Sequence, residues 1–118
     1  METRRQQKVG QLIVEALSEV FQKYGSEYYG SAFVTITDVW LSPDLLLAKI
    51  YLSIYNVENK QEHLDRISFH SSGIRKRLGI KLRNNLRRIP ELHFELDDTL
   101  DKALRVDELL KKGTPDSD

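Results

Sequence analysis

The spacing of apolar residues changes along the first half of the chain, and this change restricts the fold more than any other feature. Between Val9 and Tyr24 apolar residues recur every three or four positions, which is the period of an amphipathic helix. From Phe33 to Tyr55 apolar and polar residues mostly alternate, which is the period of a strand with one buried face. A chain with both periods must pack a helix against a sheet, so an α+β fold is expected.

A helix and a hairpin are predicted from these two periods. The helix runs from 4 to 24 and ends at Gly25, because glycine commonly follows the last turn of a helix. Two strands, 33–41 and 46–55, come next. The residues Ser-Pro-Asp at 42–44 between them are typical of a tight turn, so the two strands should be antiparallel neighbours.

Two further helices are predicted after the hairpin. Asn59, with Glu62 three positions later, resembles a capping box and begins a helix over 60–70. A helical spacing of apolar residues resumes at Ile74 and continues to about Arg88. Three small residues separate the two helices and predict an interhelical kink: Ser71, Ser72 and Gly73.

The last part of the chain should return to the sheet. Pro90 stops the preceding helix, and apolar residues then alternate in a strand over 92–96. Asp98 can cap a final helix, and residues 113–118 are expected to be a disordered tail. The predicted order α-β-β-α-α-β-α describes one α+β domain over residues 1–112, with helices packed on one face of a mixed three-stranded sheet.

The chain carries no net charge, yet its charges are strongly segregated. The segment from Arg66 to Arg88 contains eight basic residues and no acidic one. Residues 1–65 have six basic and nine acidic residues, a net charge of −3, and residues 89–118 have four and nine, a net charge of −5. Such segregation produces a local positive field, which favours an anionic partner.

A helical projection of residues 74–88, at about 100° per residue, separates apolar from basic side chains. Four apolar residues form one stripe, and six of the seven basic residues lie outside it. Arg75 falls inside the apolar arc, so its side chain must extend to solvent or reach the helix break. Because ordinary solvated faces interleave Glu with Lys, the absence of acidic residues favours RNA or DNA binding.

The predicted RNA-binding site combines this segment with the basic N-terminus. Its residues are Arg75, Lys76, Arg77, Lys81, Arg83, Arg87 and Arg88, together with Arg4, Arg5 and Lys8. The kink at 71–73 has two interpretations that stay open. Its small residues either let a phosphate backbone approach the following helix N-terminus, or simply form a bend where two helices meet.

Other functions find little support in the sequence. The absence of cysteine excludes disulfides, thiolate catalysis and cysteine-ligated zinc. The three histidines lack metal-ligand spacing, and no phosphate-binding glycine loop or nucleophile motif is present, so no enzyme, metal or cofactor is expected. No apolar run approaches the roughly 20 residues of a membrane span, and the polar N-terminus is not a signal peptide, so a cytoplasmic protein is expected.

Two alternatives to RNA binding stay open. The basic helix could dock on an acidic partner, in which case the chain is a protein-interaction module. The adjacent carboxylates of Asp97 and Asp98 could instead hold a metal in a nuclease, although helix capping explains this pair more simply.

Three stretches of the chain together resemble the ribosome-binding factor A family. They are VTITDVWLSPDLLLAKIYLSIY at 34–55, SSGIRKRLG at 71–79 and RRIPELHFELDDTLDKALRVDELL at 87–110. The resemblance implies a type II KH-like fold, in which an Ala-x-Gly kink between two helices replaces the usual phosphate-clamping loop. Ser71 stands where the family has the alanine of this kink.

The same resemblance implies a non-catalytic role in bacterial small-subunit assembly. Members of the family associate with the free 30S subunit, help 16S rRNA reach its mature form and support growth in the cold. We expect a monomer whose partner is 16S rRNA within that particle. Whether assembly GTPases act with the protein or release it stays open.

Overall fold

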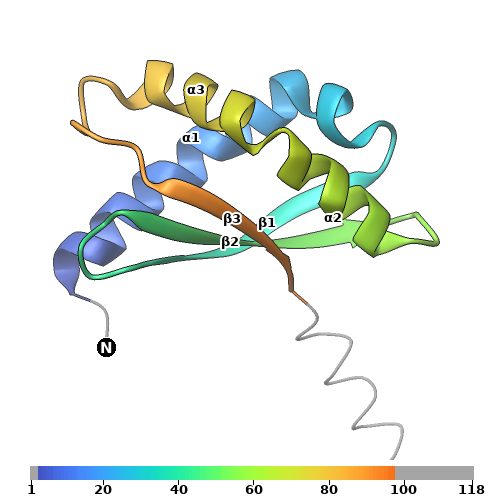
Figure 1. Cartoon of the computed structure of the whole chain (residues 1–118), viewed down its shortest axis with the longest axis horizontal. Helices are drawn as coiled ribbons and strands as arrows, with labels where there is room; N and C mark the ends of the chain where they lie inside the picture. The colour runs from blue at the N-terminus through green and yellow to red at the C-terminus, as the bar shows by residue number, and fades with distance from the viewer. Residues whose placement is uncertain (1–2, 98–118) are drawn as a thin grey trace, which may run out of the picture.

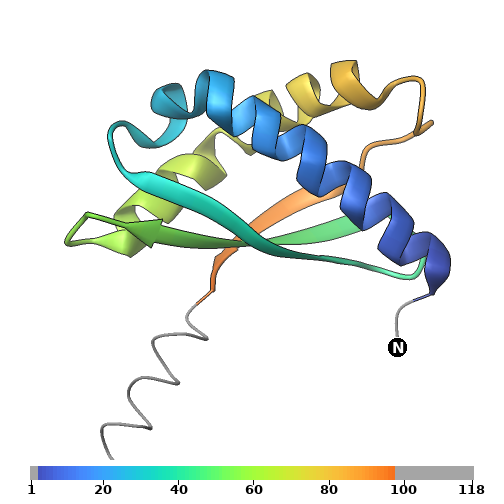
Figure 2. The same cartoon turned by 180° about the vertical axis from the view of Figure 1, so that it is seen from behind.

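The computed structural model describes residues 3–97, in which helices lie over one face of a three-stranded sheet (Figures 1 and 2). The order of elements is α-β-β-α-α-β, as the KH-like prediction requires. The predicted final helix after Asp98 and the tail at 113–118 lie outside the described residues. The elements are α1 (Arg4–Tyr29), β1 (Phe33–Leu41), β2 (Leu47–Tyr55), α2 (Lys60–Phe69), α3 (Ser71–Leu82) and β3 (Glu91–Leu96).

Strand β2 is the centre of the sheet, and its two neighbours run in opposite directions. It pairs antiparallel with β1 through the predicted turn and parallel with β3. Two parallel strands need a long crossover between them, which α2 and α3 supply. The mixed sheet predicted from the sequence is therefore confirmed, and the strand order, which the sequence left open, is β1-β2-β3.

The core lies between the sheet and the helices. Alternate residues of β2 are buried as predicted, and the apolar stripes of α1 and α3 cover them. The side chains that reach 2 % exposure or less include Ile13, Leu17, Ile50, Leu52, Ile54, Ile67, Ile74 and Leu78. No helix among residues 3–97 is long and apolar enough to cross a bilayer.

The first turn of α1 is fixed by Thr3 and Gln6. The Thr3 hydroxyl accepts a hydrogen bond from the Gln6 N–H at 3.1 Å, and the Gln6 side chain accepts one from the Thr3 N–H at 2.6 Å. Gln6 is also the buried polar residue of the core, and its Nε2 donates to the carbonyl of Leu41 at 2.8 Å. This contact holds the start of α1 against the end of β1.

Helix α1 does not end at Gly25, so that prediction is wrong. The helix continues to Tyr29 and is capped by Gly30, whose φ of 64° suits glycine. A β-carbon at Gly25 would collide with the hydroxyl of Tyr29, which folds back over the helix and donates to the carbonyl of Phe21 at 3.3 Å. Gly25 therefore makes room for a buried tyrosine.

The boundaries of α3 also differ from the prediction. The joint between α2 and α3 is His70, and Ser71, Ser72 and Gly73 form the first turn of α3 instead of a kink of their own. Helix α3 ends at Leu82, six residues before the predicted end at 88, and in the turn that follows the N–H groups of Asn85 and Leu86 both donate to the Leu82 carbonyl at 2.8 Å. Residues 83–90 are the α3–β3 loop.

Two of the glycines within helices, Gly25 and Gly73, give the first test. Gly25→Ala should lower the free energy of unfolding by about 1–3 kcal/mol, because the new methyl group displaces a buried side chain. Gly73→Ala is the matched control, since nothing lies within 4 Å of a β-carbon there. It should leave stability unchanged or raise it by up to about 1 kcal/mol. Urea denaturation measures both, and equal effects would contradict the packing role of Gly25.

Candidate nucleic-acid interface

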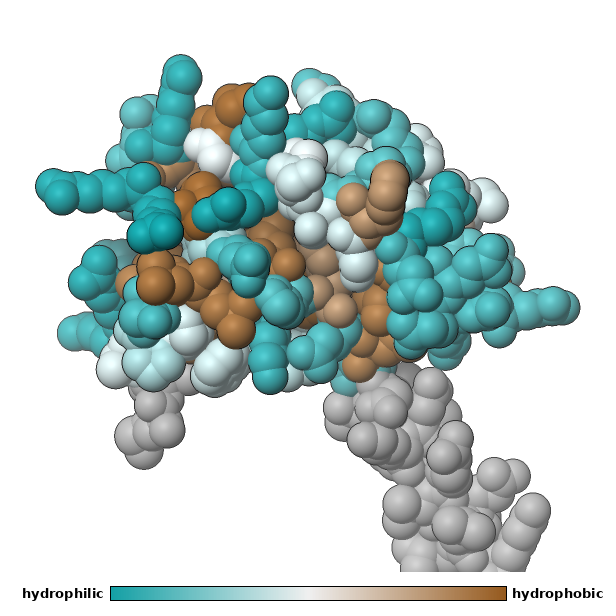
Figure 3. Space-filling view, in the orientation of Figure 1, coloured by the Kyte–Doolittle hydropathy of each residue, from teal (hydrophilic) through white to brown (hydrophobic). Residues whose placement is uncertain are grey.

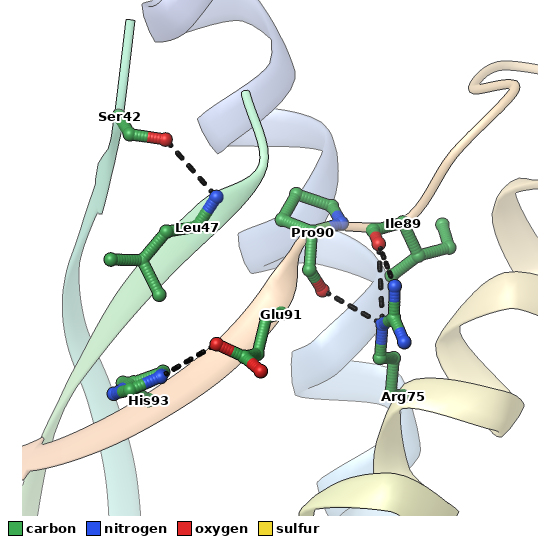
Figure 4. A network of polar contacts seen from close by, with 7 residues as sticks. All are labelled: Ser42, Leu47, Arg75, Ile89, Pro90, Glu91 and His93. Atoms are coloured by element: carbon green, nitrogen blue, oxygen red, sulfur yellow. Dashed lines mark hydrogen bonds and ion pairs between the residues drawn. The ribbon is translucent and has the colours of Figure 1, made fainter. Parts of the chain in front are cut away.

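Arg75 anchors the α3–β3 loop to helix α3 (Figure 4). Its Nη2 donates to the carbonyl of Ile89 at 2.6 Å, and its Nε donates to the carbonyl of Pro90 at 3.1 Å and lies 3.2 Å from that of Ile89. The side chain thus leaves the apolar arc, as the sequence required, but it reaches the end of the loop and not the helix break. The residues just before this anchor, Arg87 and Arg88, are thereby held near the start of α3.

A first hollow of about 530 Å³ lies between the start of α3 and the end of the loop. Three of its cations, Lys76, Arg87 and Arg88, are exposed and make no ion pair among residues 3–97. Its acidic residue, Glu91, lies 3.0 Å from His93 Nε2. The remaining lining residues are Ser71, Ser72, Arg75, Ile89 and Leu92.

A second hollow of about 470 Å³ adjoins the first. It lies between the first turns of α1, the β1–β2 turn and the α3–β3 loop, and Arg87 and Arg88 line both hollows. Helix α1 adds Arg5 and Lys8, which are exposed and also unpaired within the described part of the chain. We call the surface formed by Arg5, Lys8, Lys76, Arg87 and Arg88 the basic groove.

Figure 3 shows hydrophilic side chains projecting around a patch of hydrophobic residues at the end of the molecule that carries the loop and the β1–β2 turn. Elements far apart in the sequence meet there. The Gln6 contact holds α1 at this end, and the N–H of Glu91 donates to the carbonyl of Leu46 at 2.9 Å, which joins β3 to the turn.

Two of the predicted RNA-binding residues face helix α1 instead. The guanidinium of Arg77 lies 3.5 Å from the centre of the Tyr24 ring, and its Nη1 donates to Glu27 at 3.1 Å and to the Tyr28 hydroxyl at 2.9 Å. Lys81 Nζ donates to Glu19 at 3.1 Å. The predicted single basic arc on one helix is therefore wrong, because two of its cations hold α3 to α1.

The pKa of Arg77 reflects these contacts. Desolvation by its neighbours opposes the charge, but the hydrogen bond to Glu27 and the electrostatic attraction of Tyr28 and Glu27 outweigh it. The pKa of the Arg77 guanidinium is therefore raised, so this side chain is charged where it contacts α1.

The other predicted residues are dispersed. Arg83 caps the end of α3 and Arg4 begins α1, and neither lines the two hollows. Ser71 and Ser72 line the first hollow, whereas Gly73 does not. Sequence reasoning missed the apolar side of the second hollow, which contains Leu45 and Leu46. The signal for it was the run of three leucines directly after the Ser-Pro-Asp turn.

The nuclease alternative needs a metal site, and within residues 3–97 no group of three or more His, Asp or Glu side chains could hold a metal ion. Asp97 Oδ2 lies 2.6 Å from the hydroxyl of Thr37 at the register shift of β1. Asp98 lies outside the part of the chain that the structure describes.

The sequence pattern of the family described as Ribosome-binding factor A matches residues 5–110. The protein of that name from Cytophaga hutchinsonii is 44% identical over 114 residues, which cover 97% of this chain and 86% of the relative. The one from Chlorobium phaeovibrioides is 35% identical over 117 residues, covering 98% and 96%.

Two structures of relatives share the fold. The crystal structure of ribosome-binding factor A from Thermus thermophilus superposes with a TM-score of 0.65 at 20% identity, covering 77% of this chain and 94% of that one. A homology model of the Thermus thermophilus protein, fitted into a cryo-EM map of a complex with the 30S subunit, gives a TM-score of 0.60 at 23% identity, covering 75% and 91%.

Two neighbouring residues of α3 test which cations hold α3 to α1 and which have no partner among residues 3–97. Arg77→Gln should lower the urea midpoint of unfolding, because it removes the ring contact with Tyr24 and the bond to Glu27. Lys76→Gln makes a matched control and should leave the midpoint unchanged, since exposed unpaired charges contribute little. A larger loss for Lys76→Gln than for Arg77→Gln would show that the assignment is reversed.

Proposed function

The chain belongs to the ribosome-binding factor A family, and from this premise we propose that it binds the 30S ribosomal subunit through the basic groove. The observation that carries the proposal is the gathering around two adjacent hollows of five cations from three parts of the chain, none of which has an ion-pair partner among residues 3–97. Support for the partner comes from the related Thermus thermophilus protein, which was fitted into a map of its complex with the 30S subunit.

The proposed contact is between the basic groove and phosphates of 16S rRNA. Arginine and lysine side chains that are free of internal partners can neutralise phosphates and release their counterions. Three clamping cations, Arg75, Arg77 and Lys81, would then hold the groove in shape without touching RNA. Contacts of this kind give affinity and orientation, so the RNA is recognised mainly by its shape.

The role that follows is non-catalytic. We propose that the chain acts in the cytoplasm as a monomer with one RNA-binding domain, and that it helps 16S rRNA processing and maturation by holding part of the immature particle in place. Unpaired cations on a rigid surface suit this role, because they bind RNA without changing its covalent structure.

Charge reversal in the groove tests the proposal. The triple variant Lys76→Glu, Arg87→Glu and Arg88→Glu should weaken binding to the 30S subunit by roughly a hundredfold, because three phosphate contacts become repulsions. Co-sedimentation with purified subunits measures it, and circular dichroism confirms that the variant is folded.

The matched control reverses three basic residues away from the groove: Lys23→Glu, Lys49→Glu and Arg66→Glu. This control changes the net charge by the same amount as the groove variant. It should retain most of the binding to the 30S subunit, since none of its three residues lines either hollow. A folded groove variant that co-sediments like the wild type would refute the proposed surface.

The salt dependence of binding separates RNA from other partners. Each neutralised phosphate adds a slope of roughly −0.7 to −0.9 to log K against log salt. The double variant Arg87→Gln and Arg88→Gln should therefore make the slope for rRNA less steep by about 1.4 to 1.8. A flat salt titration, with tight binding to a purified acidic protein in the absence of RNA, would favour the protein-interaction module instead.

A further inference from the structure

The second hollow differs from the first in having an apolar side. Its apolar residues come from all three surrounding segments: Val9 and Leu12 from α1, Leu45 and Leu46 from the β1–β2 turn, and Leu86 and Pro90 from the α3–β3 loop. Phosphate oxygens interact with hydrogen-bond donors and cations, so these apolar side chains would not contribute to a surface that bound only phosphates. The hollow thus offers an apolar slot beside a cationic rim.

The β1–β2 turn is strained at this hollow. Leu45 has a φ of 62°, in the left-handed region that costs a non-glycine residue about 1–2 kcal/mol. Its side chain packs against the core, while the next residue, Leu46, is 45% exposed at the hollow. Strained backbone of this kind concentrates at ligand sites, where surrounding contacts hold it.

Hydrogen bonds fix the strained turn. Asp44 Oδ1 accepts from the Ser42 hydroxyl at 2.6 Å and from the Leu46 N–H at 3.0 Å. The Ser42 hydroxyl also accepts from the Leu47 N–H at 3.0 Å, the bond that Figure 4 shows between these two residues. The bonds from Ser42 and Leu46 lower the pKa of the Asp44 carboxyl, which keeps it ionised. Asp44 is exposed and lines the hollow, so its carboxylate offers an acceptor there.

The positive and negative charges of this hollow come from different segments of the chain. Its cations come from α1 and the loop, whereas its carboxylate comes from the turn. A phosphate is attracted by Arg5, Lys8, Arg87 and Arg88 and repelled by Asp44. A nucleotide would therefore be oriented with its phosphate at the cations and its base toward the leucines and Asp44.

We propose that the second hollow holds one unstacked nucleobase of a single-stranded RNA segment, between the leucines of α1, the turn and the loop. This inference rests on the proposed function and adds base recognition to it. The volume of about 470 Å³ lies within the range of small-molecule sites. A duplex keeps its bases paired and stacked, so only a single strand can fill the slot.

Asp44 adds a preference among the bases. A carboxylate only accepts hydrogen bonds, so it suits a base with an exocyclic amino group. Cytosine presents such a group at N4, where uracil has a carbonyl oxygen that an anion repels. The slot should therefore prefer cytosine to uracil, although the two rings have the same size.

The experiment measures binding of three nine-nucleotide strands by fluorescence anisotropy at one salt concentration: oligocytidylate, oligouridylate and a strand of abasic ribose phosphates. Wild type should bind oligocytidylate roughly fivefold more tightly than the abasic strand, a low value for a base packed on protein. It should prefer oligocytidylate to oligouridylate roughly threefold or more, as one hydrogen bond allows.

Three variants locate the effect. Leu46→Asn should abolish the advantage over the abasic strand, whereas Ile80→Asn should preserve it, because Ile80 is an equally aliphatic residue, 61% exposed and outside the hollow. Asp44→Asn should abolish the preference for cytosine, because an amide both donates and accepts.

The measurements distinguish an error in the proposed base-binding slot from an error in the proposed function. Equal binding of all three strands by wild type would overturn the slot and leave phosphate binding intact. Loss of the cytidylate advantage in Ile80→Asn as well as in Leu46→Asn would also overturn it. Absence of binding to every strand and to the 30S subunit would overturn both proposals together.

Discussion

The placement of the basic groove depends on the hydrogen bonds between Arg75 and the end of the α3–β3 loop. Because α3 ends at Leu82 and β3 must enter the sheet parallel to β2, the chain needs a loop that turns back toward the hairpin. The Arg75 guanidinium satisfies the carbonyls of Ile89 and Pro90 at this point. Arg87 and Arg88 precede the anchor directly, so they lie where α1, α3 and the β1–β2 turn approach one another.

The basic residues of segment 66–88 have two roles, and the sequence alone does not show which residue has which role. Cations that face α1 meet Glu19, Glu27 and the ring of Tyr24, and they fasten two helices together. Cations at the start of α3 and in the loop have no such partner among residues 3–97 and remain available to an anion. A net charge of zero is thus compatible with RNA binding, because some acidic residues neutralise the clamping cations while the groove keeps its positive field.

Local signals predicted most of the fold. The alternation in β2 and the Asn59 cap of α2 each depend on neighbouring residues, and each is confirmed. The predicted stop of the helix at Pro90 is wrong, because α3 already ends at Leu82. The errors occurred where contacts between residues far apart in the sequence determine the structure. Gly25 ended the predicted helix because its packing against Tyr29 was not visible in the sequence. Helix α3 was predicted too long because the carbonyls that Arg75 binds, those of Ile89 and Pro90, lie 14 and 15 residues away in sequence. The partners of Arg77 and Lys81 lie 50 and 62 residues away in sequence, so no helical projection could identify them.

We propose that the basic groove, and not the sheet or the face of α3 that contacts α1, is the surface that meets rRNA. The decisive experiment is to crosslink the wild-type protein to immature 30S particles and to map the crosslinked amino acids and nucleotides. If the basic groove binds rRNA, crosslinks form at Lys76, at Arg87 and Arg88 and at the start of α1, all to one region of 16S rRNA. The less buried face of β2 carries Tyr51 and Tyr55. Crosslinks confined to these two tyrosines, or to Arg77 and Lys81, would show that rRNA meets another surface.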